Sequence, residues 1–410
     1  MRDGKSTFDV LASIEKHIIN LTPLLPRQVI VCVGEYPIKT ILKETSASKG
    51  ALVVFIEKSS EDIYRWLPRG YKPHFVQGFE DERIDTHFWY SALPTIVRDT
   101  SVVKSVEQKA TNKLREAIIF SSVWDGVGSA TVPALIDKFR RQNMDSLSIV
   151  VLPSKIQSGD AHFNACACLQ LCMATEGAAV LLLGRDEIEE FEGVDREGSQ
   201  IRGIRVVNYL LRLFLAKELL VQEISELART FDIKMFGVVA VTAASYRVYG
   251  SLENMLNTAL LKPLLTFDLS KASLLYVLLR MPLSLKDQIP RVSVELAITD
   301  WFKEKTSPQS IHITEPIYTD DMTDRIDAVL FIGGFDISGM FGAGDVKVQA
   351  LKASAVEKGY ITEDWQVLLK AEEPTTQEEP TTQEEPTTQE EPTTQEEPTT
   401  QEEPTTQEEP

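Results

Sequence analysis

The stretch between residues 117 and 185 constrains the fold more than any other part of the chain, because apolar runs alternate there with helical patterns. The predicted elements are a strand at residues 117–120, a glycine-containing turn at 124–131, a helix at 132–141, a strand at 147–152, a helix at 163–173 and a strand at 178–183. Strands that alternate with helices build a parallel sheet with crossover helices. The turn follows a strand, where the N-terminus of the next helix can receive an anion.

The rest of the chain adds strands on both sides of this stretch. We predict strands at residues 29–33, 52–56, 235–242, 272–280, 310–317 and 328–333, and helices at 37–44, in the first part of 100–119, at 201–220 and over most of 285–304. Residues 64–90 are rich in aromatic side chains and receive no assignment. The second half of the pattern, with strands that outnumber helices, is typical of an α+β domain with helices on one face of a sheet.

The last 39 residues, 372–410, have a different composition, since they repeat Pro-Thr-Thr-Gln-Glu-Glu and contain no aliphatic or aromatic residue. Such a segment cannot bury a core, so we expect a disordered acidic tail. Its seven Glu-Glu pairs carry 14 of the negative charges, and the net charge of −19 therefore leaves −5 for residues 1–371. A polyanionic tail argues against nucleic-acid binding. Two interpretations stay open: a solubilising bristle, or a docking arm for a basic protein partner.

Several classes of protein are disfavoured by what the chain does not contain. No apolar run approaches the roughly 20 residues of a membrane span, and the N-terminus shows no signal peptide. The four cysteines suit buried thiols in a reducing cytoplasm. Cys166, Cys168 and Cys172 share one predicted helix, and His162 is close, but this spacing does not favour a metal site.

The turn and the second half of the chain both resemble the tubulin/FtsZ superfamily of polymerising GTPases. Aligned on Pro133, the family loop GGGTGTG or GGGTGSG corresponds to Trp124-Asp125-Gly126-Val127-Gly128-Ser129-Ala130. Residues 320–333 are similar to the segment that ends the FtsZ domain. The resemblance covers about residues 27–335, and its departures are similar to those of the diverged archaeal members.

The resemblance implies a domain organisation. It predicts an N-terminal extension at residues 1–26 and a Rossmann-like, GTPase-like nucleotide domain at 27–230. The long helix at 201–220 would be the central helix that joins the two domains. A smaller α+β domain would follow at 231–335, then a C-terminal extension at 336–371 and the tail at 372–410.

The same resemblance implies GTP as the cofactor, with Mg²⁺ in the case of a true GTPase. The residues that correspond to the family's nucleotide contacts are Gly34, Gly126, Val127, Gly128 and Ser129 around the phosphates, and Asn208 and Tyr209 around the purine. The phosphate side is eroded: Gly34 is followed by Glu35, which repels phosphate, and Pro37 has no N–H to donate.

In this family one subunit inserts an acidic loop into the nucleotide site of the next. That loop corresponds to Val221-Gln222-Glu223-Ile224-Ser225-Glu226. Glu223 and Glu226 keep the spacing of the family's two acidic residues, which orient the attacking water. They are therefore the candidate catalytic residues, although glutamates are also common in the first turn of any helix.

The resemblance thus implies a cytoplasmic protein that assembles with copies of itself, head to tail, into filaments. We expect weak GTP binding and slow or absent hydrolysis. Two alternatives stay open, a true GTPase with divergent loops and a nucleotide-independent structural or adaptor protein. A dehydrogenase is disfavoured, because Gly34-Glu35-Tyr36 lacks the G-x-G-x-x-G turn.

Overall fold

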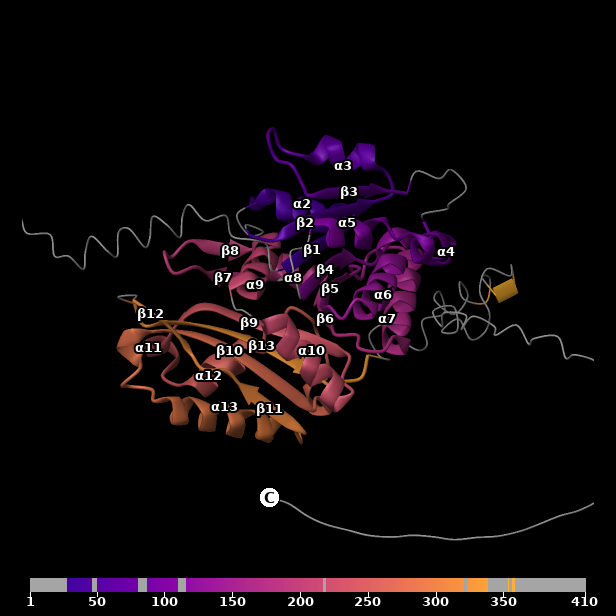
Figure 1. Cartoon of the computed structure of the whole chain (residues 1–410). Coiled ribbons are helices and arrows are strands. Elements are labelled where there is room, and N and C mark those ends of the chain that lie inside the picture. Colours follow the sequence, from indigo (N-terminus) through magenta and orange to yellow (C-terminus); the bar gives the residue numbers. More distant parts are fainter. Residues whose placement is uncertain are drawn as a thin grey trace, which may run out of the picture. The chain divides into compact units, whose positions relative to one another are not determined.

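The computed structural model describes most of the chain between residues 28 and 337. The described residues are 28–45, 50–79, 87–109, 116–216, 219–320, 323–337, 353, 356 and 357. Among them, eleven strands form one sheet in the order β11-β10-β13-β9-β6-β5-β4-β1-β2-β3, with β12 paired to β10 beside this path. Most of its pairings are parallel, so the predicted α/β class with a large, mostly parallel sheet is confirmed (Figure 1).

Six strands make up the parallel half of the sheet. In sheet order they are β3 (Phe75–Gly78), β2 (Leu52–Glu57), β1 (Gln28–Val33), β4 (Glu116–Ser122), β5 (Asp145–Leu152) and β6 (Val180–Gly184). β1 and β4 are buried along their whole length. Such continuous apolar runs are typical of parallel strands that helices cover on both faces. Because Gln28 pairs with Glu116, β1 and β4 begin together and their carboxyl ends meet at one edge.

The other half of the sheet joins this one through β9 (Met235–Ser245), which pairs parallel to β6. β13 (Arg325–Gly333) pairs antiparallel to both β9 and β10 (Leu274–Pro282). The predicted strand at residues 310–317 is divided into β11 (Ser310–Ile313) and β12 (Ile317–Thr319), since Pro316 between them has no N–H for a sheet hydrogen bond. The sheet is continuous from β6 to β9, and the predicted domain boundaries stay predictions.

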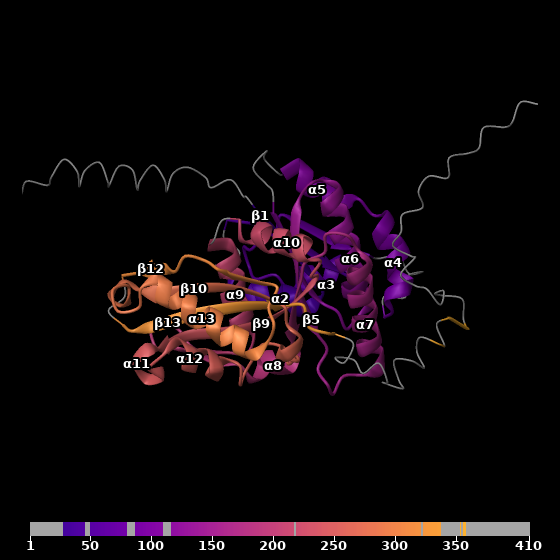
Figure 2. The ribbon, with the colours of Figure 1, turned by 90° about the horizontal axis from the view of Figure 1, so that it is seen from below.

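Helices cover both faces because alternate side chains of each strand point to opposite sides. One face of the parallel half packs against α4 (Trp89–Arg98), α5 (Ser101–Lys109), α6 (Gly126–Arg141) and α7 (Gly159–Ala174). The other packs against α2 (Glu35–Lys43), α3 (Ser60–Trp66), α8 (Arg185–Glu190), α9 (Ile204–Ala216) and α10 (Leu220–Phe231). α6 and α7 lie side by side in both views (Figures 1 and 2).

The antiparallel half has its own helices. α9 and α10 extend over one face of β9, β10 and β13, and α12 (Leu252–Ala259) and α13 (Arg291–Lys305) cover the other. The short α11 (Tyr246–Tyr249) precedes α12, and a separate hairpin of β7 (Glu192–Val194) and β8 (Gln200–Arg202) precedes α9.

The structure corrects the predicted ends of two helices, α6 and α9. Helix α6 begins at Gly126, so most of the predicted turn at residues 124–131 is helical, because Asp125 caps the helix there. Helix α9 spans Ile204–Ala216 and is shorter than the predicted helix at 201–220. The candidate catalytic segment at 221–226 forms the first turns of α10 instead of a loop.

Part of the predicted organisation lies outside the described residues, namely the extension at 1–26, most of 336–371 and the tail at 372–410. In the region without an earlier assignment, the structure has the end of α3, β3 and the start of α4. No helix within the described ranges is long and apolar enough to cross a bilayer.

Candidate functional site

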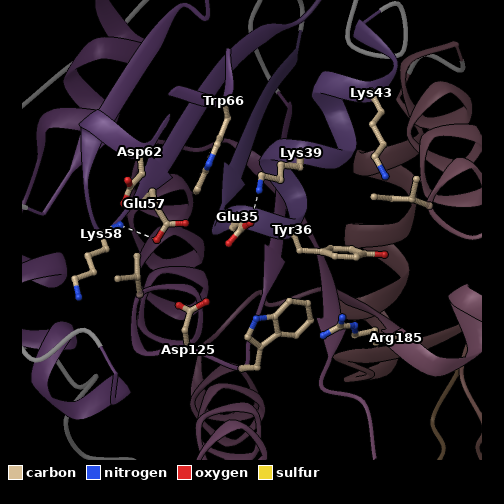
Figure 3. A pocket seen from close by; sticks show the side chains of 13 residues that line it. Glu35, Tyr36, Lys39, Lys43, Glu57, Lys58, Asp62, Trp66, Asp125 and Arg185 are labelled. Carbon is tan, nitrogen blue, oxygen red and sulfur yellow. Dashed lines mark hydrogen bonds and ion pairs between the residues drawn. The ribbon is translucent and has the colours of Figure 1, made fainter. Parts of the chain in front are cut away.

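A cavity of about 570 Å³ opens at the carboxyl ends of β1, β2, β4 and β6 (Figure 3). We call it the strand-end cavity. Its lining consists of Glu35, Tyr36, Lys39, Lys43, Glu57, Lys58, Asp62, Trp66, Trp124, Asp125, Val127, Arg185 and Ile204. In open parallel sheets, ligands bind outside the carboxyl ends of the strands, so this is the expected place for a functional site.

The N-terminus of α6 faces this cavity, and the amide groups of Gly128 and Ser129 there both donate to Asp125. The Asp125 carboxylate accepts a hydrogen bond of 2.7 Å from the Gly128 N–H. The buried Ser129 hydroxyl donates to the Asp125 carbonyl oxygen at 2.5 Å, inside the helix itself. The position where an anion would bind therefore holds a carboxylate of the chain's own. A phosphate group does not fit this end of the helix while Asp125 is ionised.

Two of the predicted phosphate-binding glycines have a packing role that the geometry explains. A Cβ on Gly128 would lie 1.9 Å from the backbone oxygen of Ser122, so only glycine lets α6 approach β4 this closely. Gly34 has a φ of +92°, and a Cβ there would lie 2.7 Å from the Ser122 hydroxyl. Of the predicted phosphate contacts, Val127 lines the cavity and Gly126 lies between it and Asp125.

Carboxylates dominate the inner wall of the cavity, as Figure 3 shows for Glu57 and Asp125. Burial raises the pKa of Glu57 to about 7, and the nearby charge of Asp125 adds to this. Burial also raises the pKa of Asp125 to about 6, against the hydrogen bond from Gly128. When these two carboxyl groups are ionised they repel a triphosphate, which disfavours tight binding.

Basic and aromatic side chains form the outer wall. Lys39 is paired with Glu35 one turn earlier in α2 and lies 4.9 Å from the centre of the Trp66 ring. The Arg185 guanidinium lies 5.2 Å from the centre of the Trp124 ring, and Tyr36 meets that ring edge-on at 5.5 Å. Flat rings and guanidinium groups of this kind can hold a planar aromatic ligand.

The buried acidic wall leads to a prediction about stability and pH. Because the folded protein raises the pKa of Glu57 to about 7, the stabilising effect of its protonation is present at acidic pH and lost as pH rises through 7. Glu57→Gln should therefore be about 2 kcal/mol more stable than the wild type at pH 8.5 and equally stable near pH 5. Thermal melts at both pH values measure this difference.

The control for that prediction is Asp62→Asn in the same cavity. Asp62 is 43% exposed and paired with Arg65, so its replacement should change stability little at either pH. If Glu57→Gln shows no dependence on pH relative to the wild type, the carboxyl group of Glu57 is not buried as described.

The two predicted purine contacts do not line the strand-end cavity. Asn208 is buried and donates from its side-chain amide to the Thr40 carbonyl of α2 at 3.0 Å. Tyr209 is also buried and lines a different cavity, beside β10 and β13. Within the described residues, α9 contributes only Ile204 to the strand-end cavity. The roles of Asn208 and Tyr209 in nucleotide binding stay predictions.

The candidate catalytic glutamates lie at the opposite ends of the same strands. The backbone N–H of Gln222 in α10 donates to Glu116 at the start of β4, at 3.3 Å. Beside it, Glu223 accepts a hydrogen bond from the Tyr276 hydroxyl, and Glu226 accepts one of 2.8 Å from the Gln222 side chain. A strand such as β4 spans roughly 20 Å, so these glutamates and the strand-end cavity occupy opposite ends of the parallel half.

Sequence reasoning missed several residues of the cavity. Asp125 was noted only as the counterpart of a family glycine, Glu57 corresponds to the Asn of the family's Asn-Thr-Asp after the second strand but was not chosen as a site residue, and Arg185 received no role. Each comes at or just after the end of a predicted strand, and that position is the signal that could have identified them. Across the part of the chain that the structure describes, no three His, Cys, Asp or Glu side chains gather as metal ligands.

Comparison with known proteins gives matches in structure but none in sequence. No family model matches the chain, and no curated protein matches it. The structure of CetZ2 from Haloferax volcanii, a GTPγS-bound protofilament, superposes with a TM-score of 0.60 at 17% identity, covering 81% of this chain and 99% of that one. TubZ from Bacillus thuringiensis serovar israelensis, a GTPγS-form protofilament, gives 0.57 at 11% identity, with 85% and 98% covered.

A third structure extends the likeness to FtsZ. The empty FtsZ dimer from M. jannaschii superposes with a TM-score of 0.53 at 13% identity, covering 80% of this chain and 92% of that one. At such low identity, the likeness establishes the fold and leaves the activity open. The order of strands, the strand-end cavity and these superpositions together show that the chain has the tubulin/FtsZ fold.

Proposed function

We propose that this protein assembles with copies of itself, head to tail, into linear filaments in the cytoplasm. We further propose that it binds guanine nucleotide weakly and hydrolyses it slowly or not at all. Two of the similar structures, CetZ2 and TubZ, are GTPγS protofilaments, which supports assembly of a chain with this fold. The four cysteines, all free, are compatible with a reducing compartment.

The observation that carries the proposal is the polarity of the parallel half. The strand-end cavity opens at the carboxyl ends of β1, β2 and β4, and the acidic side chains of α10 lie beside the amino ends of β4 and β5. When one copy's α10 end meets the next copy's cavity end, the contact is heterologous and can repeat from copy to copy. Because the two surfaces lie at opposite ends of the same strands, we propose that the repeat extends as a linear filament instead of closing into a ring.

Weak nucleotide binding is supported by the Asp125 carboxylate at the N-terminus of α6. Its charge lies where the family fold receives phosphate, and Glu57 lies beside it. The basic residues Lys58 and Arg185 of the same cavity can offset part of this repulsion. The same observation favours the second candidate function, a filament or adaptor protein that needs no nucleotide.

The proposal is tested by assembly of the full-length protein with and without GTP. We expect linear protofilaments in negative-stain images and a sedimenting fraction that rises with concentration. Glu226→Lys should reduce sedimentation at least tenfold, because a cation would replace an exposed carboxylate in the proposed contact.

Glu295→Lys is the matched control, since Glu295 is also a helical glutamate with a partner within the same helix, on α13. It should assemble as the wild type does. A wild-type protein that stays monomeric at high concentration in both conditions would contradict the filament. Normal assembly of Glu226→Lys would instead contradict the proposed contact at α10.

The tail at residues 372–410 lies outside the described residues, and its role is proposed from its composition alone. Because it has no apolar residue, its deletion should leave the melting temperature within about 1 °C of the full chain. We expect its deletion to change filament bundling or the binding of a basic partner, less so at high salt. A large fall in melting temperature would show that the tail contributes to the folded core.

A further inference from the structure

A second cavity, of about 460 Å³, lies where α9 passes the ends of β9, β10 and β13. Four arginines line it, Arg196 before β8, Arg205 and Arg212 on α9, and Arg280 on β10. We call it the arginine cavity. The sequence predicted no site here and named only one lining residue, Tyr209, as a purine contact. The arginine cavity shares no residue with the strand-end cavity.

The floor of the arginine cavity is a buried ion-pair network. The Asp327 carboxylate is 4% exposed and accepts from Arg280 at 2.6 Å and from Arg196 at 3.1 Å. It also accepts from the Ala243 backbone N–H at 2.5 Å. The pairing of β13 with β9 shifts register at this point, and Ala243 has a φ of +44°. The backbone at Ala243 is held in a conformation that non-glycine residues rarely adopt, and the Asp327 carboxylate accepts from three donors. Together they make the floor of the cavity rigid.

The wall formed by α9 offers donors to a ligand. Arg205, Tyr209 and Arg212 lie four and three residues apart, so that they share one face of the helix. The Tyr209 side chain is only 7% exposed, yet its hydroxyl has no hydrogen-bond partner among the described residues. A buried hydroxyl without a partner costs free energy, and an acceptor on a ligand would recover it.

Charge in the cavity favours a small anion. The four arginines exceed the three lining acids Asp195, Glu197 and Asp327 by one charge. Asp195 is occupied within its own loop, where its carboxylate accepts from the backbone N–H groups of Glu197 and Ser199.

On the α9 wall, Arg212 pairs with Glu44 at 3.1 Å and Arg205 donates to the Gln200 carbonyl oxygen at 3.0 Å. Each guanidinium has five N–H donors, so both can still donate to an anion in the cavity.

An apolar cleft adjoins this wall and shares four residues with the arginine cavity, Tyr209, Leu213, Arg280 and Asp327. Its other lining residues are Leu278, Leu279, Ile317 and Val329. Ile317 is 46% exposed, which leaves apolar surface open at the entrance. The cleft has a volume of only about 40 Å³, so a ligand that fills both parts needs an anionic group at one end and a slender apolar part at the other.

We propose that the arginine cavity binds a small organic anion, whose carboxylate or phosphate group contacts Arg205, Arg212 and the Tyr209 hydroxyl while its slender apolar part enters the adjoining cleft. Guanidinium groups match the planar geometry of carboxylate and phosphate oxygens, and the tyrosine hydroxyl donates a further hydrogen bond. Such a ligand would contact both α9 and the strands β10 and β13. The site shares no lining residue with the strand-end cavity, although Ile204 of that cavity directly precedes Arg205.

The test uses two fluorescent probes of similar size, the anion 8-anilinonaphthalene-1-sulfonate and the neutral N-phenyl-1-naphthylamine. Arg205→Gln with Arg212→Gln in the full chain should weaken binding of the anion at least tenfold and leave the neutral probe unchanged. Arg212→Gln alone, at a side chain that is 48% exposed, should fold normally and weaken the anion severalfold. Tyr209→Phe should weaken it about fivefold.

Arg291→Gln is the matched control, because Arg291 is 55% exposed and paired with a glutamate, as Arg212 is with Glu44. Its affinity for both probes should equal that of the wild type. Octanoate and octyl phosphate should displace the anionic probe, and the stronger competitor identifies the anionic group. Octanol should not displace it.

Three outcomes would overturn the proposal. They are absence of saturable binding of the anionic probe, equal affinity in the wild type and the double arginine variant, and displacement by octanol as effective as displacement by the two anions.

Discussion

Gly128→Ala is expected to destabilise the protein by about 3 kcal/mol, which lowers the melting temperature by roughly 5–10 °C. The new Cβ would lie 1.9 Å from the backbone oxygen of Ser122, and neither atom belongs to a side chain that can rotate away. Helix α6 and strand β4 would have to separate at their closest point, beside the strand-end cavity. Thermal melts followed by circular dichroism measure the change.

Gly184→Ala provides the matched control for this contact. A Cβ on Gly184 would also approach another atom to 1.9 Å, but that atom is the Oε2 of the Glu187 side chain. The glutamate can turn away and lose only its exposed hydrogen bond with Thr266, so we expect a cost of about 1 kcal/mol or less. Equal losses in the two variants would show that the approach of α6 to β4 does not set the requirement for glycine.

The start of helix α6 at Gly126 was not predictable from the sequence. Glycines at 126 and 128 next to a strand are typical of a turn, and the predicted turn at 124–131 followed that pattern. In the structure, Gly128 is helical, and its missing side chain serves a contact with β4 that no local pattern encodes. Five of the six strands of the parallel half were predictable, because they are apolar runs, whereas β3 lies in the region that received no assignment.

The candidate site was predictable in place but not in detail. Ligands of parallel sheets bind at the carboxyl ends of the strands, and Val127 and the residues around it do lie there. Asn208 and Tyr209 were placed by position along a helix, yet which face a helical residue presents depends on how the helix is rotated against the sheet. Here Asn208 contacts Thr40, and Tyr209 lines the arginine cavity.

Asp125→Asn is expected to raise the affinity for GTP at least tenfold at pH 8. The asparagine can still accept the hydrogen bond from Gly128, so α6 keeps its cap, and only the negative charge at its N-terminus is removed. One charge pair a few ångströms apart is worth roughly 1.4–3 kcal/mol at the edge of a protein, which corresponds to about tenfold to 150-fold in affinity. Calorimetric titration with GTP measures the change.

The pH dependence of GTP affinity tests whether the Asp125 carboxylate is what weakens binding. The pKa of Asp125 is raised to about 6, so the wild type loses this charge as pH falls through 6, and its affinity should approach that of Asp125→Asn near pH 5.5. Protonation of GTP itself affects both proteins equally and cancels in their ratio. Asp62→Asn removes an exposed charge that Arg65 already offsets, and should leave the affinity within about twofold of the wild type.

The same variant separates the proposed functions. If Asp125→Asn binds GTP well and turns it over, the additional replacement of Glu223 and Glu226 by alanine should abolish turnover but leave binding intact, since these side chains would act on a neighbour's site. If Asp125→Asn still binds no GTP, the Asp125 charge is not what limits nucleotide binding. In that case protein contacts alone would drive assembly. The strand-end cavity would then serve as a contact surface for the next subunit and not as a nucleotide site.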